Sequence, residues 1–273
     1  MIMTDIKNIL ALLNEIAPFN LSEDWDNSGL QVGMMDGEVK KVIIGLDVSL
    51  PILDAATNGR FDLIITHHPL MIHPEKSFDF SRMPGKVIEI AAKQGLNIIS
   101  LHTNIDKASG GLNDYFASSI GLKQTTPLII DSSMRALKKE CTGIGRIGYL
   151  DSRLTLKQLV HQIKQKLNLS YLRATGDLEM PVTTVAICTG SGGSLIDEFL
   201  ISSAEVFITG DVKYHDARRV EEHLKGIIDV GHFGSEWMVV DLLYEKLSQA
   251  FHEAGLNIEL AKFKEEKDPF TIF

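Results

Sequence analysis

The chain has 273 residues, of which 44% are hydrophobic and 23% are charged, a balance typical of a globular protein with a substantial core. Its formal charge of −9 argues against a broad basic face of the kind that binds nucleic acid or an anionic membrane. The two cysteines form no Cys-x-x-Cys pair, which argues against a disulfide framework or a zinc knuckle. There is no signal-peptide pattern before residue 18 and no membrane-length apolar run, so we expect a cytoplasmic protein outside the membrane.

Short apolar runs alternate with amphipathic stretches along most of the chain. In the first part the pattern predicts strand 42–47, helix 50–58, strand 63–66, helix 85–94, strand 97–101 and helix 111–120. In the later part it predicts strand 143–150, helix 155–167, strand 184–188, helix 194–201, strand 206–209, helix 213–224, strand 227–230 and helix 235–254. Strands without polar alternation, separated by helices of about three turns, indicate parallel sheets that are covered on both faces.

This rhythm breaks between residues 121 and 150, where a glycine-interrupted strand replaces the regular alternation. We therefore predict an α/β protein made of two packed, three-layer α/β lobes with mostly parallel sheets. The first lobe is predicted at 1–125 and the second at 126–230. Residues 231–273 are predicted to return to the first lobe.

Histidines and carboxylates gather where predicted strands end. In open parallel sheets, ligands bind at the carboxyl ends of the strands. Three strand ends carry such residues: His67 and His68 after the second strand, His102 and Asp106 after the third, and His232 and Glu236 after the last strand of the chain.

The types and spacing of these residues indicate a metal site. The adjacent His67 and His68 point to opposite sides of an extended backbone, which suits two neighbouring ions. His232 and Glu236 are four residues apart and face the same way on a helix. Asp106 and Glu236 supply the carboxylates that a pair of divalent ions needs, and imidazole with carboxylate favours Zn, Mn, Fe, Co or Ni over Ca. The alternative is that these are loop residues with unrelated roles.

Histidine 102 has three possible roles: a metal ligand, a residue that orients a ligand, or a substrate contact. His102 lies four residues before the proposed ligand Asp106, and of these three roles we favour the orienting one. Four other histidines are expected at the surface: His73, His161, His223 and His252.

A glycine-rich segment at 189–194 is the first candidate for substrate binding. The backbone N–H groups of Gly190 and Gly192 could bind a phosphate there, or the segment could be a plain tight turn. It is not a dinucleotide-binding fingerprint, because Leu195 stands where the last glycine would be.

A second candidate follows the strand predicted at 206–209. Lys213 and His215 could contact the substrate. Asp211 is expected to cap the helix that begins there. The chain has no nucleophile elbow, Walker loop or His-Glu-x-x-His helix, so any catalytic nucleophile is expected to be metal-bound water.

Five segments resemble the GTP cyclohydrolase 1 type 2 family, also called the Nif-three-like family. They are 25–33 (WDNSGLQVG), 66–70 (THHPL), 102–106 (HTNID), 209–217 (TGDVKYHDA) and 231–236 (GHFGSE), in the order of the family. The resemblance implies two α/β lobes, a dinuclear metal centre in the cleft between them and a ring-shaped homohexamer. The metal ligands that it implies are His67, His68, Asp106, His232 and Glu236.

The resemblance also implies an activity. Metal-bound water would open the guanine imidazole ring of GTP to give dihydroneopterin triphosphate and formate, with Glu236 and His102 as the candidate proton-moving residues. The same ligands and the glycine turn also fit a metal-dependent phosphatase or pyrophosphatase acting on another phosphorylated or nucleotide-like small molecule. A third hypothesis is a metal-binding interaction protein without turnover.

Overall fold

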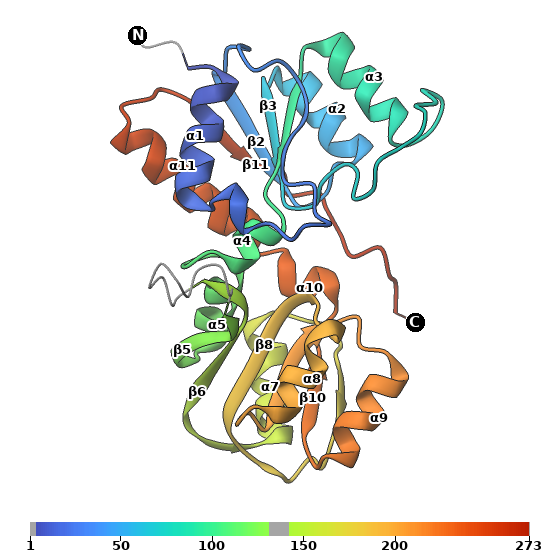
Figure 1. Ribbon diagram of the computed structural model, residues 1–273, viewed down its shortest axis with the longest axis vertical. Coiled ribbons are helices and arrows are strands. Elements are labelled where there is room, and N and C mark those ends of the chain that lie inside the picture. The colour runs from blue at the N-terminus through green and yellow to red at the C-terminus, as the bar shows by residue number, and fades with distance from the viewer. Residues whose placement is uncertain (1–3, 131–141, 273) are drawn as a thin grey trace. The chain divides into compact units, whose positions relative to one another are not determined.

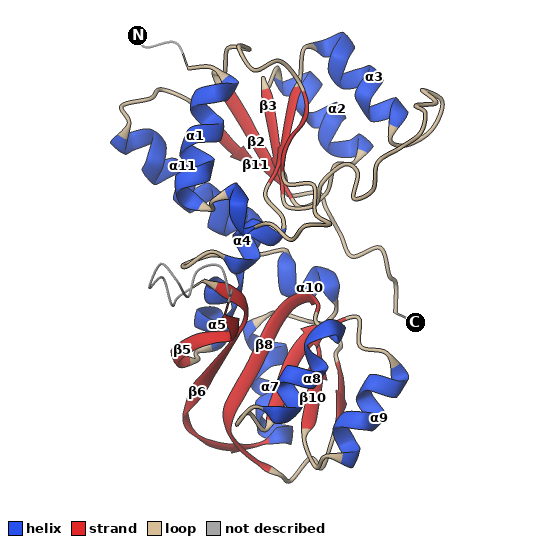
Figure 2. Cartoon of the chain, viewed as in Figure 1, coloured by secondary structure: helices blue, strands red, loops and turns tan. Residues whose placement is uncertain are grey.

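A computed structural model describes residues 4–130 and 142–272 of the chain, which divides into two compact units. Unit 1 consists of Met1–Ile105 and Val239–Lys267, and unit 2 consists of Asp106–Met238 and Asp268–Phe273. Each unit has its own sheet with helices beside it (Figure 2). No helix in the described part of the chain combines the length and the apolarity needed to cross a bilayer.

The sheet of unit 1 has the strand order β1-β4-β3-β2-β11. Its strands are β1 (Gly29–Val32), β2 (Lys41–Gly45), β3 (Leu63–Thr66), β4 (Asn97–Ser100) and β11 (Glu259–Lys262). All neighbouring pairs are parallel except β1, which pairs with β4 in the antiparallel direction at one edge. Every residue of β3 and β4 is buried, which is why isoleucines occupy adjacent positions in both strands.

Helices cover both faces of this sheet, with α1 and α11 on one face and α2 and α3 on the other (Figure 1). Their bounds are α1 (Ile6–Ile16), α2 (Leu50–Gly59), α3 (Gly85–Gln94) and α11 (Val239–Glu253), with a short 3-10 helix at Phe19–Leu21. Asp5 caps α1 by accepting a hydrogen bond from the N–H of Asn8 at 2.9 Å, and Gly95 ends α3 with φ 68°. Unit 1 therefore has the predicted three-layer architecture.

The sheet of unit 2 has the strand order β5-β6-β8-β9-β10-β7. Its strands are β5 (Lys123–Ile130), β6 (Gly143–Thr155), β7 (Arg173–Thr175), β8 (Pro181–Ser191), β9 (Val206–Gly210) and β10 (Gly226–Asp229). β8, β9 and β10 are parallel to one another, whereas the other three pairings are antiparallel. This sheet is thus mixed rather than mostly parallel, because the partly exposed strands at its edges lack the continuous apolar runs that the sequence analysis relied on.

Unit 2 is also a three-layer unit, with α5 and α7 on one face of the sheet and α8 and α9 on the other. The bounds are α5 (Leu112–Ile120), α7 (Leu156–Lys166), α8 (Ile196–Ile201) and α9 (Tyr214–Glu222), with a 3-10 helix at Gly193–Leu195. A short helix, α10 (His232–Glu236), contacts β8 and β9.

The division into units differs from the predicted boundaries at 125 and 231. It falls inside the short helix α4 (Thr103–Lys107), and α5 packs on β6 and β8, so residues 106–125 belong with the second sheet. Because α10 contacts β8 and β9, His232 and Glu236 also belong to unit 2. Only 239–267 of the C-terminal segment belongs to unit 1, and α11 starts at Val239 rather than at the predicted 235.

Candidate metal centre

Three neighbouring strands of unit 1 end in register, and this places two histidine-bearing segments at one edge of the sheet. Gly45 pairs with Thr66 across β2 and β3, and Thr66 pairs with Ser100 across β3 and β4. One residue beyond this line lies His67, and two residues beyond it lie Asp47, His68 and His102. The parallel register therefore groups residues that are far apart in the sequence.

The imidazoles of His67, His68 and His102 converge. Their ring centroids are 5.0 Å apart for the first two, 5.1 Å for His67 and His102, and 5.6 Å for His68 and His102. One ring nitrogen of each residue lies within 4.8 Å of the others, close enough for a shared ion. His102 is thus a member of the same group as the two histidines predicted to be ligands.

Each of these rings is held through its Nδ1 atom. The contacts are His67 Nδ1 to the carbonyl oxygen of Leu101 at 2.8 Å, His68 Nδ1 to Asp47 Oδ1 at 2.7 Å and His102 Nδ1 to Asp26 Oδ1 at 2.7 Å. A carbonyl oxygen only accepts, so His67 Nδ1 carries the proton and Nε2 keeps its lone pair; a carboxylate favours the same tautomer. This arrangement is typical of metal-binding histidines.

Asp26, which the sequence analysis did not single out, orients His102. Its carboxylate also accepts hydrogen bonds from Ser28 Oγ at 2.8 Å and from Thr103 Oγ1 at 2.6 Å. Burial raises the pKa of Asp26, but the hydrogen bonds from His102, Thr103 and Ser28 and the charge of His102 outweigh this effect and hold the pKa well below its usual value. The only signal in the sequence was the position of Asp26 in the 25–33 motif.

The loops that carry these histidines are fixed by further polar contacts. The hydroxyls of Thr66 and Ser100 both donate to the carbonyl oxygen of His68, at 2.8 Å and 3.1 Å. Glu266 accepts hydrogen bonds at 2.8 Å from the N–H groups of Leu46 and Asp47. Burial raises the pKa of Glu266, although these two N–H groups act in the opposite direction.

In unit 2, His232 is oriented in the same way as the histidines of unit 1. Its Nδ1 atom lies 2.7 Å from Asp211 Oδ2, and Asp211 adopts the unusual φ of 55° directly after β9. The predicted cap role of Asp211 is therefore not what the structure has: the residue before α9 is Lys213, which makes no side-chain cap. Asp211 instead selects the tautomer of His232.

The Nε2 atom of His232 lies 2.9 Å from Glu236 Oε2. With the proton on Nδ1, both of these atoms are acceptors, and two acceptors at this distance repel each other unless a proton or a metal cation shares them. The predicted same-face arrangement of His232 and Glu236 on one helix is present.

Gly190 leaves the space that the Glu236 carboxylate occupies. A Cβ atom at Gly190 would lie 2.2 Å from Glu236 Oε1. The Gly190 N–H donates to Ser235 Oγ at 2.8 Å, and the Gly192 N–H donates to Thr209 Oγ1 at 2.9 Å. Both N–H groups that were candidates for phosphate binding are therefore engaged by side chains of unit 2, and the glycines serve close packing instead.

Asp106 is tied to the same region through Asn113, a fully buried residue (0% exposed) that the sequence analysis missed. Asn113 Nδ2 donates to the carbonyl oxygen of Asp106 at 3.1 Å, and its Oδ1 accepts the N–H of Thr189 at 3.1 Å. Arg146, 1% exposed, pairs with Asp114 and donates to the carbonyl oxygen of Ala108. Asn113 lies inside the helix predicted at 111–120, and nothing in the sequence indicated that it would hold Asp106.

The thiol of Cys188 reports the charge of this region. Burial raises its pKa strongly, and the charges of Asp106 and Glu236 raise it further, whereas Arg146 lowers it. Both carboxylates therefore act on the end of β8. Cys188 is buried, as the sequence predicted, while Cys141 lies outside the described residues.

The donor atoms fit divalent transition-metal ions: three imidazoles in unit 1, and the imidazole of His232 with the carboxylate of Glu236 in unit 2. An Nδ1 contact alone is not diagnostic, because His161 and His223 make one to a carbonyl of their own helix. Those two side chains are exposed and isolated, as are His73 and His252, all in line with the sequence prediction.

The two other predicted substrate contacts lie on or beside α9. Lys213 borders a pocket on unit 2. His215 is exposed, with its ring edge against Tyr214 at a centroid distance of 5.3 Å. Neither residue belongs to the histidine group of unit 1 or to the His232–Glu236 pair.

Comparison with known proteins places this chain among relatives of the same length and fold. It is 31% identical over 267 residues to a "GTP cyclohydrolase 1 type 2 homolog" of Clostridium acetobutylicum, covering 98% of each chain. It is 33% identical over 235 residues to the "GTP cyclohydrolase 1 type 2" of Helicobacter pylori strain J99, covering 86% of this chain and 88% of the other. The crystal structure of a hypothetical protein from Staphylococcus aureus matches with a TM-score of 0.92 and 27% identity, covering 100% of both chains.

The family profile described as Duf34/NIF3 (NGG1p interacting factor 3) matches residues 4–269. This range contains both units and all the strand-end residues described above. The chain therefore belongs to the Duf34/NIF3 family.

Proposed function

We propose that this chain is a divalent-metal-dependent hydrolase that opens the imidazole ring of GTP and releases formate. The observation that supports this proposal most directly is the convergence of His67, His68 and His102, whose Nδ1 atoms are all held by acceptors. The name of the Helicobacter pylori relative supports the choice of GTP.

In this proposal two divalent ions, of Zn, Mn, Fe, Co or Ni, are held by His67, His68, Asp106, His232 and Glu236. When bound, the ions would supply positive charge that activates water and stabilises negative charge on the substrate. The Nδ1 atoms of His67, His68 and His232 contact Leu101, Asp47 and Asp211, respectively. The Nε2 atom of each ring would therefore hold an ion.

The protein's own residues would move the protons. A first water adds to C8 of the guanine ring, and cleavage of one C–N bond at that carbon leaves a formamide. A second water adds to the same carbon, and cleavage of the other C–N bond releases it as formate. Glu236 would take the proton of the attacking water, and His102 would deliver a proton to a departing ring nitrogen. Asp26 suits this role of His102, because its carboxylate contacts Nδ1 at 2.7 Å and holds the ring in one orientation.

The test is to load the purified protein separately with Zn and Mn, supply GTP, and measure formate and phosphate in the same reaction. We expect one formate for each GTP consumed, and loss of this activity in His67→Ala. Phosphate release without formate would favour a phosphatase instead, and the absence of both products with every metal would contradict hydrolysis of GTP.

We further propose that the chain forms a homohexamer, on the basis of the family resemblance. Light scattering should then give a mass of six times the 30.2 kDa chain. A monomer mass would contradict it.

A further inference from the structure

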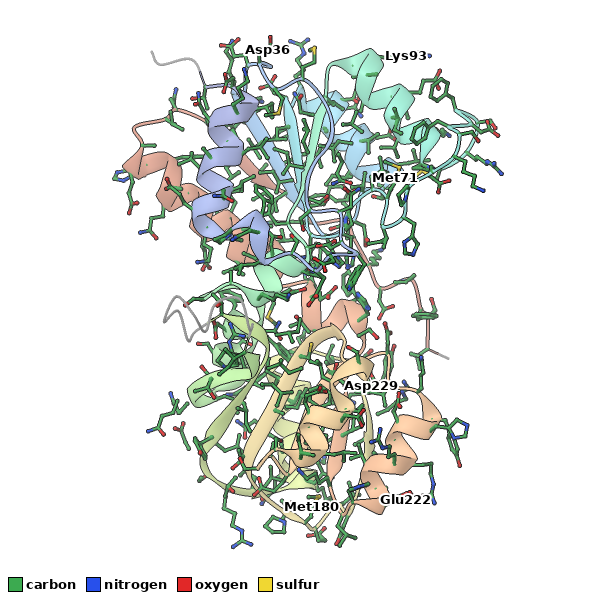
Figure 3. The ribbon with its side chains drawn as sticks, in the orientation of Figure 1. Asp36, Met71, Lys93, Met180, Glu222 and Asp229 are labelled. Carbon is green, nitrogen blue, oxygen red and sulfur yellow. The ribbon has the colours of Figure 1, made fainter. Side chains whose placement is uncertain are left out.

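Two adjoining pockets lie on unit 2. The larger, about 430 Å³, is bordered by His232, Asp211, Phe233 and residues 268–272. The smaller, about 200 Å³, is bordered by Lys213 and Tyr214. Arg173 and Asp229 line both pockets (Asp229 is labelled in Figure 3). Arg173 and Asp229 therefore form a wall that the two pockets share. His232 borders the larger pocket and Lys213 borders the smaller one.

The guanidinium of Arg173 is held at this wall by Asp229 and Val212. Its Nη2 atom pairs with the Asp229 carboxylate and donates to the carbonyl oxygen of Val212 at 3.2 Å. Among the residues that the structure describes, Nε and Nη1 of Arg173 have no partner, and its side chain is 67% exposed. These N–H groups are suited to an anionic oxygen that enters either pocket.

Lys213 supplies a second positive charge to the smaller pocket. Against Arg173 and Lys213 stands one carboxylate, Asp229, which is 6% exposed and already accepts the N–H groups of Val212 at 3.2 Å and Gly231 at 3.0 Å. The lining also includes the apolar residues Ala174, Val212, Ala217 and Ile227, and such surroundings strengthen the attraction of the two cations for an anion.

The larger pocket has the opposite charge balance. Asp211, Asp229 and Asp268 line it, and Arg173 is the one arginine or lysine among the described residues that line it. Its walls include the aromatic side chains of Tyr171, Phe233 and Phe270, which offer faces for stacking on a flat ring. An anion is therefore favoured in the smaller pocket, beside Arg173 and Lys213. An uncharged ring is favoured in the larger pocket, beside His232.

We propose that Arg173 and Lys213 form a binding subsite for a phosphate group of the substrate, separated from the metal ligand His232 by the larger pocket. This inference rests on the proposed function and gives the orientation of the substrate. The phosphates lie at Arg173 and Lys213, and the ring to be opened lies beside His232. A phosphatase would need the reverse orientation, with the phosphate at the metal ligands.

The test compares the binding of guanosine 5′-monophosphate and guanosine to the metal-loaded protein by calorimetry. We expect the monophosphate to bind more tightly to the natural protein. Lys213→Met should weaken its binding by about five- to tenfold and leave guanosine binding unchanged. Arg173→Lys, which keeps a charge beside Asp229 but loses the forked donor, should weaken the monophosphate by about tenfold. Lys157→Met, which removes an exposed lysine of the same unit outside both pockets, is the matched control.

Three results would overturn the subsite. Guanosine could bind as tightly as the monophosphate, Lys213→Met could weaken both ligands equally, or the preference for the phosphate could survive in Lys213→Met and disappear in His232→Ala. Because Lys213 is exposed, its replacement keeps the test valid even if Arg173→Lys does not fold. Failure of formate release alongside an intact, Lys213-dependent preference would remove the proposed function and leave the phosphate subsite standing.

Discussion

Units 1 and 2 both place candidate metal ligands at the carboxyl edge of a sheet, but they hold those ligands by different means. In unit 1 the candidate ligands His67 and His68 are imidazoles, and each is aligned by an acceptor, the carbonyl of Leu101 or the carboxylate of Asp47. Asp26 aligns the neighbouring His102 in the same way. In unit 2 the two carboxylates are positioned by neighbouring groups. Asn113 fixes the backbone beside Asp106, and Gly190 gives Glu236 its space.

The difference follows from the chemistry of the two ligand types. An imidazole presents a lone pair on only one nitrogen, so an acceptor on the other nitrogen must select the tautomer. The two oxygens of a carboxylate are equivalent, so position is all that must be specified, and close packing is enough. His232 supports this view, because it is the one imidazole of the unit 2 set and it has its own carboxylate, Asp211.

Removal of an imidazole ligand should have the largest effect. His67→Ala deletes one of the three converging rings and should weaken the binding of divalent metal by roughly 100-fold, measured by calorimetry or by elemental analysis after dialysis. The matched control is His161→Ala, which removes an exposed ring whose Nδ1 also contacts a carbonyl oxygen. Equal metal content in both variants would contradict a metal site at the three converging histidines of unit 1.

Filling the space beside Glu236 should come next. Gly190→Ala places a Cβ atom 2.2 Å from Glu236 Oε1 and should lower metal affinity by about 10- to 100-fold. Gly255→Ala is a close control: φ is +65° there and +63° at Gly190, but no atom lies within 4 Å of the new Cβ. Both variants should lose about 1 kcal/mol of stability from the left-handed backbone, and only Gly190→Ala should lose metal. Unchanged metal affinity would separate Glu236 from the metal centre.

A smaller effect is expected at Asn113. Asn113→Leu removes both the donor to Asp106 and the acceptor for Thr189, and should cost about 1–3 kcal/mol of stability and about tenfold in metal affinity. Asn113→Asp keeps an acceptor for Thr189 but cannot donate to the Asp106 carbonyl when ionised. If the hydrogen bond from Asn113 sets the position of Asp106, both variants should alter the absorption spectrum of the cobalt-loaded protein. A normal cobalt spectrum in Asn113→Leu would limit Asn113 to a structural role.

The smallest expected effect concerns acid stability in unit 1. The native pKa of Asp26 lies below its ordinary value of 3.8, so the unfolded chain binds more protons than the native protein in this range. The stabilisation from Asp26 is therefore complete above about pH 4 to 5 and is lost as the pH falls below 3.8 toward the native pKa. The urea midpoint of the metal-free protein should fall less steeply with pH below pH 4 in Asp26→Asn than in the natural chain. Identical slopes in the two proteins would contradict the lowered pKa of Asp26.

The sequence recovered the local elements of both units well. It predicted β3 at 63–66 and α3 at 85–94 with the bounds that the structure has, because a fully buried strand and a helix closed by Gly95 each leave a local pattern. It missed β1, β5, β7 and β11, and with them the mixed character of the second sheet, because short or partly exposed strands carry no continuous apolar run.

The residue types and strand-end positions of the candidate ligands were also available from the sequence alone, since parallel strands bring their carboxyl ends to one edge whatever their separation along the chain. Only the tertiary structure revealed what holds them: the register that sets Asp47 beside His68, the approach of Asp26 to His102, and the close contact of Gly190 with Glu236. These contacts join residues between 21 and 76 positions apart. Their geometry depends on strand order and register, which are set by the packing of the whole unit rather than by any local pattern.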